Sequence, residues 1–557
     1  MLFLYRHYVL TLSFLLAACG ATSAQVTPTR IDKIVREHLG DHGTTTPGAA
    51  VLVTHRGETI FSKGYGMANL EYSFSITDTT VFDLASVAKQ FTGYAIAKLV
   101  TEGKITLTDD VRKYVPEFPD FGPELTVEHL VHHTSGLRDW TSTLPLAGWS
   151  FKDVISLEQI LRMVYKQRAL NFPPGEEYAY SNAGYNVLAE IVQRVTGQEF
   201  QDWTAEHIFQ PLGMERTRFW HDETNPIPGR AIGYFQNRGN YFPHPNLTTA
   251  LGSSSLLSTT TDLAKWTNHL LDPGAERQDI VDLMFQNGRL NDGSSIDYAF
   301  GIEKDEYRDQ PWINHDGGWA AFSTHVILVP EQALTIIILR NSWGNTYRMA
   351  RAITDLYLPE QPSIEAATAT EEAAHVSLSP KVLDAYVGTY KLGPGWYLTL
   401  SREGDRLQAQ ATNEDKFSVT TVREDFFRVP DYSNRSIEFE KDANGKVTSL
   451  VYLGESRPRL EGTSTFEPQR APEYAGVYYC PELETFYEVK AEDGALSMHH
   501  FRKGRIDLFN AWNDEFGSGR GFLQTVEFSR NAQGEIDGLY VSNFRARRQW
   551  MEKQEQP

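Results

Sequence analysis

The pattern of the chain changes once, near residue 361, and this change limits the folds that are available to it. Residues 31–358 alternate between strand-like and helical patterns, whereas residues 380–557 consist almost entirely of strand-like patterns. Between them, residues 361–379 are rich in Ala, Thr and Glu and lack apolar periodicity, which is typical of an exposed linker. Because 557 residues are too many for one ordinary core, we expect a multi-domain protein with independent cores.

The β-rich segment contains an internal repeat. Residues 385–390 recur as residues 473–478, and residues 437–445 recur as residues 526–534, at offsets of 88 and 89. Hairpin turns centred on glycine, such as Glu403-Gly404, separate the strands of each copy. We therefore expect two small antiparallel β-barrels, residues 380–465 and 466–557, that shield the preceding domain or narrow the entrance to its site.

The first domain, residues 26–360, has strands at both ends and helices between them. Residues 49–55 and 58–65 form a hairpin pattern, and residues 323–329 and 333–339 are apolar strands around a Pro330-Glu331 turn. This order predicts an α+β domain, in which one antiparallel sheet is assembled from both ends of the segment and is flanked by a helical region.

Three short motifs within this domain carry chemistry. Ser86 and Lys89 lie three residues apart at the start of a helical stretch, residues 86–100, so an amine can lie beside a hydroxyl on one helical face. Tyr180-Ser181-Asn182 and His315-Asp316-Gly317 follow in that order. A serine needs a neighbouring base to become a useful nucleophile, so these motifs predict an active-site serine hydrolase.

The context of the motifs resembles one family. The order S-x-x-K, a tyrosine motif and a glycine-containing third motif is similar to that of the serine β-lactamase and penicillin-binding-protein superfamily, including class C β-lactamases, D-aminopeptidases and esterases of the peptidase family S12 type. The β-barrel repeats resemble the lipocalin-like domains that some members carry. Further stretches match the same family: residues 103–110, 133–137, 172–175, 211–214 and 258–263.

The chemistry assigns a role to each motif residue. Ser86 is the nucleophile that forms an acyl-enzyme, and Lys89 accepts its proton if burial and a second nearby cation keep the amine neutral. Tyr180 is the partner base or proton shuttle that later protonates the leaving group. Asn182 is expected to hydrogen-bond Lys89 or the substrate amide.

The resemblance places the third motif on an edge strand of the sheet that lines the cleft. Gly317 would keep this strand open to substrate, and the backbone N–H groups of Gly318 and Ser86 would form the oxyanion hole. The motif begins with His315 where β-lactamases have lysine, and an imidazole is only partly charged at pH 7. This replacement weakens the case for a β-lactamase or a D-alanyl carboxypeptidase, and it favours the D-aminopeptidase and esterase branch.

The N-terminus has the pattern of an export signal. Arg6 and His7 precede an apolar run, residues 8–18, which has the size of a signal-peptide core and is too short to span a membrane. Residues 16–19 resemble a bacterial lipobox in which Cys19 would be lipidated; the alternative is ordinary cleavage of residues 1–24, leaving Gln25 first. Either interpretation predicts export, to the periplasm, to the outer membrane as a lipoprotein, or out of the cell.

Charge and cysteine content exclude other classes. A net charge of −20 argues against nucleic acid or anionic lipid as a partner, so we expect membrane contact only through a lipid on Cys19. Because Cys480 is the second of two cysteines, no internal disulfide is expected after processing. His129, His132 and His133 form the one histidine cluster, and without matching ligands we expect a capped helix there rather than zinc. We expect no metal and no cofactor.

The sequence therefore predicts an exported serine hydrolase that cleaves amide bonds of small peptides, a class that includes peptides with D- or non-protein residues. A carboxylesterase with the same site is the first alternative, because both reactions use the same acyl-enzyme chemistry. A D-alanyl-D-alanine carboxypeptidase, a β-lactamase-like enzyme or a slow penicillin-binding sensor is the second. The expected partner is a small peptide or ester substrate, and the oligomeric state stays open.

Overall fold

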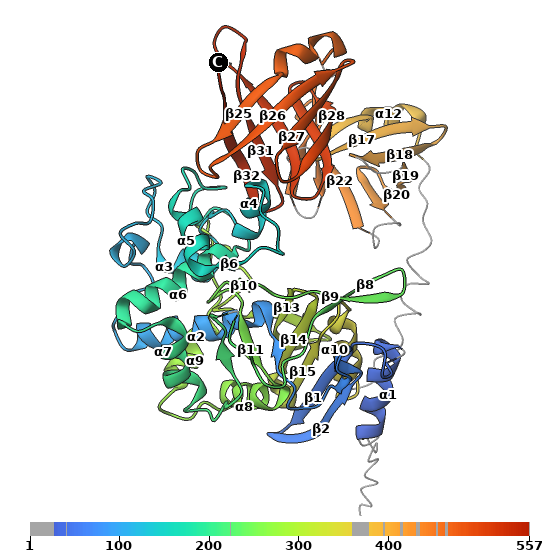
Figure 1. The fold of residues 1–557 in the computed structure, drawn as a ribbon. Helices are drawn as coiled ribbons and strands as arrows, with labels where there is room; N and C mark the ends of the chain where they lie inside the picture. Colours follow the sequence, from blue (N-terminus) through green and yellow to red (C-terminus); the bar gives the residue numbers. More distant parts are fainter. Residues whose placement is uncertain are drawn as a thin grey trace, which may run out of the picture.

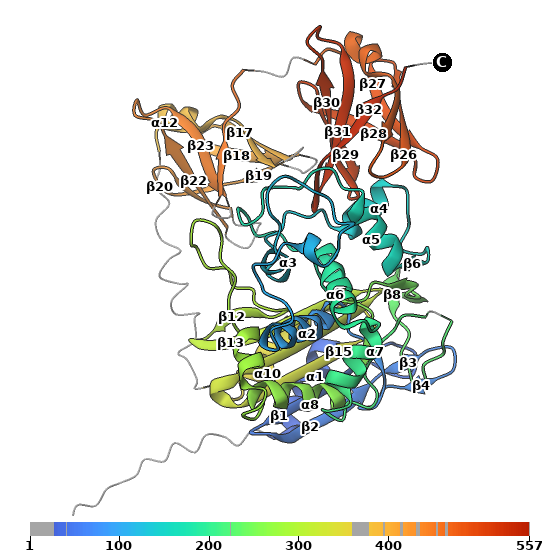
Figure 2. The same ribbon diagram turned by 90° about the vertical axis from the view of Figure 1, so that its left-hand side faces the viewer.

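The computed structural model describes residues 27–40, 42–222, 224–358, 378–393, 396–412, 416–429, 435–452, 455–462 and 466–555. The predicted signal peptide with Cys19 lies outside these residues, as does the predicted linker except for Leu378 and Ser379. The catalytic-type domain forms one end of the molecule, and the two β units lie side by side at the other end (Figures 1 and 2). Among the described residues, no helix is long and apolar enough to cross a membrane.

The first domain is built on a six-stranded antiparallel sheet with the strand order β12-β13-β14-β15-β1-β2. The first two strands along the chain therefore join the last strands of the same domain, as the sequence predicted; Val51, for example, pairs with Ile338. The strands are β1 (Ala49–His55), β2 (Glu58–Tyr65), β12 (Glu303–Tyr307), β13 (Gln310–Trp319), β14 (Phe322–Val329) and β15 (Leu334–Arg340).

The central strands of this sheet, β1, β14 and β15, are buried on both faces. Val51 and Val53 face a core shared with two helices, α1 (Pro28–Leu39) and α10 (Thr346–Thr354), whereas Ala50 and Leu52 face the large core of the helical region. Strands that are covered on both sides are apolar throughout rather than alternating, which explains the continuous apolar run of β1.

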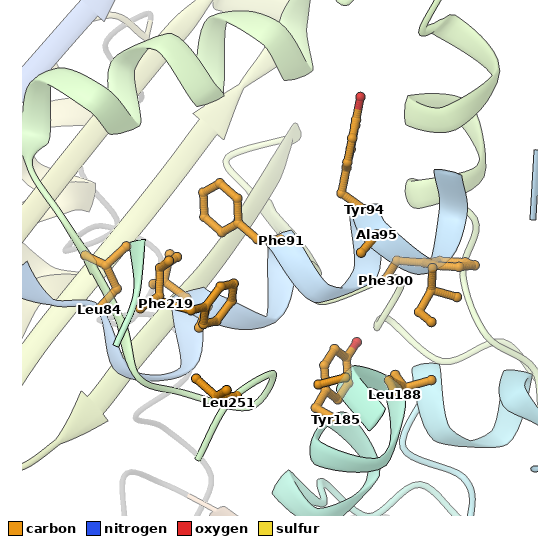
Figure 3. Close-up of a cluster of buried hydrophobic side chains, with 14 of the residues drawn as sticks. Leu84, Phe91, Tyr94, Ala95, Tyr185, Leu188, Phe219, Leu251 and Phe300 are labelled. Atoms are coloured by element: carbon orange, nitrogen blue, oxygen red, sulfur yellow. The ribbon is translucent and has the colours of Figure 1, made fainter. Parts of the chain in front are cut away.

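The helical region surrounds α2 (Lys89–Thr101), which begins beside Ser86 and is buried along most of its length. Phe91 and Tyr94 of α2 lie in the same core as Tyr185 and Leu188 of α6 (Asn182–Thr196) (Figure 3). The other helices of this domain are α3 (Val127–Val131), α4 (Trp140–Leu146), α5 (Leu157–Tyr165), α7 (Phe200–Thr204), α8 (Thr260–Leu271) and α9 (Gln278–Met284).

Short strands occur between these helices. The strands are β3 (Met67–Asn69), β4 (Phe74–Ser75), β5 (Phe82–Asp83), β6 (Ile155–Ser156), β7 (Arg218–Phe219), β8 (Tyr234–Asn237), β9 (Asn240–Pro243), β10 (Thr248–Thr249) and β11 (Leu256–Ser258). β5, β11 and β7 form a three-stranded sheet that leads directly into the turn carrying Ser86.

The second β unit closes into the predicted barrel. Its eight antiparallel strands are β25 (Gly476–Cys480), β26 (Thr485–Glu492), β27 (Ala495–His500), β28 (Gly504–Trp512), β29 (Glu515–Arg520), β30 (Leu523–Arg530), β31 (Ile536–Asn543) and β32 (Ala546–Lys553). Its core holds Tyr478, Tyr487 and Cys480, so this cysteine packs inside the barrel, and burial raises the pKa of its thiol to about 11.

The first β unit differs from the closed barrel that we expected. After α12 (Pro380–Tyr386), its described strands form two sheets, one of four strands and one of five. A bridge between Tyr390 and Arg459 brings the two sheets together at one side. At the other side the ladder ends at β19, which is only two residues long. The strands are β16 (Gly388–Gly393), β17 (Trp396–Glu403), β18 (Arg406–Ala411), β19 (Phe417–Ser418), β20 (Thr420–Arg423), β21 (Phe426–Val429), β22 (Arg435–Lys441), β23 (Val447–Tyr452) and β24 (Glu455–Pro458).

The second β unit is docked tightly on the catalytic-type domain, beside α4 (Figure 1). Leu146, the last residue of α4, is buried in the core of the barrel, and its carbonyl accepts a 2.8 Å hydrogen bond from the Tyr487 hydroxyl. Arg138 forms a 2.9 Å ion pair with Glu482 of the barrel, and their side chains are only 2% and 6% exposed. The expectation of fully independent cores therefore fails at this interface.

Candidate active site

Ser86 lies in a tight turn that precedes α2. Residues 85–88 form a 3-10 turn that runs directly into the α-helix, so Ser86 is placed one turn before the helix rather than within it. A 3-10 turn has about three residues per turn, so residues i and i+3 align, and Lys89 stays beside Ser86. Ala85 has φ 49°, a strained value for a residue with a Cβ, and its N–H donates a 2.9 Å bond to Asp83.

The Lys89 amine is buried at the centre of the site. Its Nζ lies 3.2 Å from Ser86 Oγ, and it donates to Asn182 Oδ1 at 2.7 Å and to the Ser253 carbonyl at 2.8 Å. The side chain is 0% exposed, and none of these three partners is an anion. A lysine amine in such surroundings can give up its proton readily.

Burial is the main reason why the pKa of Lys89 lies well below its usual range. Asp139 opposes this shift, Arg545 of the C-terminal barrel lowers the pKa further, and Asp316 and Glu303 have smaller effects in the same direction as Asp139. The arrangement supplies both conditions that the sequence reasoning required for a neutral lysine, burial and a second cation.

Tyr180 lies against the same amine. Its ring centroid is 4.8 Å from Lys89 Nζ, and the ring packs 4.2 Å from the ring of His133. Burial raises the pKa of Tyr180 well above its usual range; Ser86 is close enough to oppose this shift, although no hydrogen bond of normal geometry joins the two hydroxyls. Tyr180 is therefore a neutral phenol, which suits a proton shuttle better than a phenolate base.

The histidine cluster has structural roles. His133 Nδ1 accepts a 3.1 Å bond from the backbone N–H of Ser181 and so holds the tyrosine motif in place. His129 completes a capping box with Thr126 at the start of α3, and His132 Nδ1 lies 3.2 Å from the Tyr298 carbonyl. Each of the three ring systems thus contributes to a local contact.

Asn182 connects Lys89 to a residue that the sequence reasoning missed. Its Oδ1 faces the lysine amine, while its Nδ2 and backbone N–H donate to Asp139 Oδ2 at 2.8 Å and 3.0 Å. Asp139 also caps the N-terminus of α4. An Asp that precedes a helix is a recognisable capping signal, but its contact with Asn182 depends on the tertiary fold.

The third motif lies on β13, which is the second strand of the sheet rather than its edge. β12 pairs with β13 only as far as Asn314, so the part of β13 from His315 onward is not covered by β12. A Cβ at Gly317 would lie 2.3 Å from the Leu84 carbonyl and 3.1 Å from the Ser86 N. Glycine is therefore required there, because it lets β13 approach the serine turn closely.

His315 is a buried, neutral residue in this structure. Its Nδ1 donates a 2.6 Å bond to the Asp316 carbonyl, so in the neutral ring Nε2 accepts from the Tyr298 hydroxyl at 3.1 Å. Burial lowers the pKa of His315 to about 3. His315 therefore supplies no positive charge near pH 7.

These residues surround a cavity of about 540 Å³. Five of the seven residues predicted for the active site, Ser86, Tyr180, Asn182, His315 and Gly318, line it, whereas Lys89 and Gly317 do not. The lining residues are Ser86, Trp140, Thr141, Phe151, Tyr180, Asn182, Ser254, Glu303, His315, Asp316, Gly318, Trp319 and Arg545.

One wall of the cavity is acidic. Single ligand atoms of Glu303, His315 and Asp316 lie within 4.8 Å of one another. Burial raises the pKa of Glu303 to about 7, and Asp316 adds to this shift; burial also raises the pKa of Asp316. No sequence motif indicated Glu303. It reaches the third motif only because β12 pairs with β13 in the folded sheet.

Comparison with known proteins places this site in a family. The model of the beta-lactamase family matches residues 31–358, which is more than half of the chain. The chain belongs to the beta-lactamase family. A second family model, a domain of unknown function named DUF3471, matches residues 372–470, and this range contains the first β unit.

Proteins with similar sequences include a penicillin-binding protein, a D-aminopeptidase and a protein named flp. "Penicillin-binding protein 4*" of Bacillus subtilis is 27% identical over 390 residues, which are 65% of this chain and 84% of that protein. "D-aminopeptidase" of Gluconobacter oxydans is 26% identical over 453 residues, which are 79% of this chain and 80% of that protein. "Protein flp" of Staphylococcus aureus strain N315 is 30% identical over 319 residues, 56% of this chain and 62% of that protein.

Solved structures support the fold. The octameric penicillin-binding protein homologue from Pyrococcus abyssi has a TM-score of 0.53 at 20% identity and covers 86% of this chain and 99% of its own. The hydrolase EstCE1 has a TM-score of 0.51 at 21% identity, covering 59% of this chain and 99% of its own. Together with the D-aminopeptidase relative, the family identifies this protein as a serine hydrolase with a β-lactamase-like catalytic domain.

Proposed function

We propose that this protein cleaves amide bonds of small peptides through a Ser86 acyl-enzyme, with Lys89 as the base and Tyr180 as the proton shuttle. The observation that carries the proposal is the buried Lys89 amine, 3.2 Å from Ser86 Oγ and without an anionic hydrogen-bond partner. A neutral amine in this position has a lone pair with which to accept the serine proton.

In the proposed reaction, the proton of Ser86 passes to Lys89 Nζ while Oγ attacks the substrate carbonyl carbon. The carbonyl oxygen becomes an oxyanion, which the N–H groups of Ser86 and Gly318 would stabilise. The proton then moves from the lysine through the Tyr180 hydroxyl to the leaving nitrogen, and the C–N bond breaks. Water attacks the acyl-enzyme by the same proton route, which releases the acid and restores Ser86.

The size and the walls of the cavity support a small substrate. A cavity of about 540 Å³ that is bounded by Trp140, Phe151 and Trp319 suits a short peptide better than a folded protein. The match to the D-aminopeptidase relative covers 79% of this chain, which is more than the catalytic domain alone, and this supports the peptide assignment, including D-residues, over the ester alternative.

The mechanism is tested with D-amino-acid p-nitroanilides and p-nitrophenyl esters on the wild type and on variants. We expect Ser86→Ala to lose activity by several orders of magnitude, and Lys89→Met and Tyr180→Phe to impair acylation while the fold stays intact. A Ser86→Ala protein that keeps most of its activity would overturn the proposal.

The same panel separates the alternatives. Faster turnover of esters than of anilides by more than the difference in their intrinsic reactivity would make the protein a carboxylesterase. Long-lived labelling of Ser86 by a fluorescent penicillin without turnover of any substrate would favour the sensor alternative.

We also propose that the protein is exported and that Cys19 carries a lipid. The support is the sequence of residues 1–24 alone. Cys19→Ser is expected to move the protein out of the membrane fraction and to stop lipid labelling. A mature N-terminus at Gln25 would show ordinary signal cleavage instead.

A further inference from the structure

The C-terminal barrel inserts one hairpin into the catalytic domain. The hairpin joins β31 to β32 and carries Phe544 and Arg545 at its tip. The Arg545 carbonyl accepts bonds from the Asp139 N–H at 3.1 Å and from Asn171 Nδ2 at 3.2 Å. Asn543 Nδ2 donates to the Ser142 carbonyl at 2.9 Å. These backbone contacts fix the position of the tip.

The side chain of Arg545 points into the cavity that holds Ser86. The guanidinium carbon lies 4.9 Å from the Tyr180 ring centroid, and Nη1 donates to Asp139 Oδ2 at 3.3 Å. The side chain is 32% exposed, whereas Asp139 is fully buried. A guanidinium has five N–H donors, and the contact with Asp139 is the one side-chain hydrogen bond of Arg545 among the described residues.

Arg545 is also the group that remains positively charged in this cavity. The pKa of Lys89 is lowered by burial and that of His315 lies near 3, while Glu303 and Asp316 of the sheet also line the cavity. The cavity lining therefore combines one cationic group from the barrel with an acidic pair from the sheet.

We propose that Arg545 is a specificity-determining residue that binds a carboxylate of the substrate. The preferred substrates are then small peptides with a free carboxylate close to the scissile bond. The planar guanidinium matches a carboxylate with two parallel N–H···O bonds, and Asp139 holds its other side in place. This inference rests on the proposed function, because it places the substrate in the cavity beside Ser86.

The test compares D-alanyl-D-alanine with D-alanyl-D-alaninamide, which differ only in the C-terminal carboxylate. We expect the wild type to favour the free acid in kcat/KM by about tenfold to a hundredfold, as for a charge-assisted hydrogen bond. Arg545→Gln is expected to bring this ratio close to one, mainly through KM, and Arg545→Lys is expected to keep part of it. Each variant is measured at the pH of its own maximum.

Arg548→Gln is the matched control. Arg548 lies three residues later, on β32, but its guanidinium pairs with Glu527 on the barrel at 2.7 Å, and it does not line the cavity. We expect this variant to keep the wild-type ratio. A wild type without preference, or an Arg545→Gln variant that loses activity equally on both peptides, would overturn the inference; the second outcome would leave Arg545 a purely structural role.

A binding measurement separates this inference from the proposed function. Calorimetry on the Ser86→Ala variant reports the affinity for both peptides whether or not Ser86 is the nucleophile. Tighter binding of the free acid, lost again in Ser86→Ala/Arg545→Gln, supports the carboxylate site even if the mechanism fails. Equal affinity, or binding of neither peptide, overturns the inference even if the mechanism holds.

Discussion

The two β units share one internal scaffold. In the first unit, the Tyr386 hydroxyl donates to Asp425 at 2.7 Å, Lys441 pairs with the same Asp425, and the Tyr390 hydroxyl donates to the Tyr386 carbonyl at 2.8 Å. The second unit repeats all three contacts 88 or 89 residues later. The equivalent residues are Tyr474, Asp514, Arg530 and Tyr478.

The units differ in what they contact. The second closes as a barrel, takes Leu146 into its core and places Arg545 in the catalytic cavity. In the first unit, the hairpin that joins β23 to β24 has shorter strands; Ser456 of β24 pairs with Val451, and its hydroxyl bonds Glu440 within its own unit. The comparison teaches that one scaffold, used twice, gained a role at the active site through the tip of a single hairpin.

Removal of both units is expected to have the largest effect. A protein that ends at residue 360 would expose Leu146 to water and would lose the bonds that Arg138 makes to the barrel, and apolar surface that becomes exposed favours aggregation. We expect little soluble protein and no measurable hydrolysis, checked by yield and by thermal unfolding. A well-folded fragment with wild-type acylation of Ser86 would contradict the dependence on the second unit.

A single substitution in the buried Arg138–Glu482 ion pair tests how far stability depends on the second unit. Glu482→Gln is expected to lower the free energy of unfolding by about 3–5 kcal/mol. The control is Lys391→Met, which breaks the 2.9 Å ion pair with Glu515 between the two β units; Lys391 is 35% exposed, so we expect a loss below about 1 kcal/mol. Equal losses of unfolding free energy, measured by chemical denaturation, would mean that the interface with the catalytic domain and the interface between the two β units contribute equally to stability.

The shared scaffold predicts equal effects at equivalent tyrosines. Tyr386→Phe and Tyr474→Phe each remove a hydroxyl bond to an Asp, which is expected to cost about 1–2 kcal/mol of stability in either unit. Denaturation curves of the two variants would provide the measurement. A loss of stability in only one of the two variants would show that the repeated hydroxyl contacts contribute unequally to the two units.

The smallest expected effect is a shift in pH dependence. Lys89 must be neutral to act, so activity rises as the pH increases through its lowered pKa. Arg545 lowers that pKa; therefore Arg545→Gln raises it and moves the acid limb of the kcat/KM profile to higher pH. Ser456→Ala, on the matching hairpin of the first unit, should leave the limb in place. An unmoved limb in Arg545→Gln would argue against the electrostatic contact with Lys89.

The regular parts of the fold were accessible from the sequence. Four of the six strands of the large sheet, β1, β2, β14 and β15, were predicted from local strand patterns, and the Arg56-Gly57 turn has positive φ at both residues, as a two-residue hairpin requires. The open form of the first β unit was not accessible, because barrel closure depends on long-range pairing between strands rather than on the pattern of any one strand.

The candidate site also contains residues that the sequence predicted and residues that it did not. Ser86, Lys89, Tyr180 and Asn182 were found because short motifs fix their local spacing, and the structure brings all four together. Asp139 and Arg545 were missed: they are 406 residues apart in the chain, and no local pattern joins them. His315 was expected to be partly charged, but its burial decides otherwise.

The sequence by itself determined which residues can react and which of them share a helical turn, because these properties depend on side-chain chemistry and on backbone period. The tertiary structure alone decided the protonation state of Lys89, the neutrality of His315 and the place of Arg545 beside Tyr180. The physical reason is that pKa values and substrate contacts depend on burial and on nearby charges, and here one of those charges, Arg545, comes from a domain at the far end of the chain.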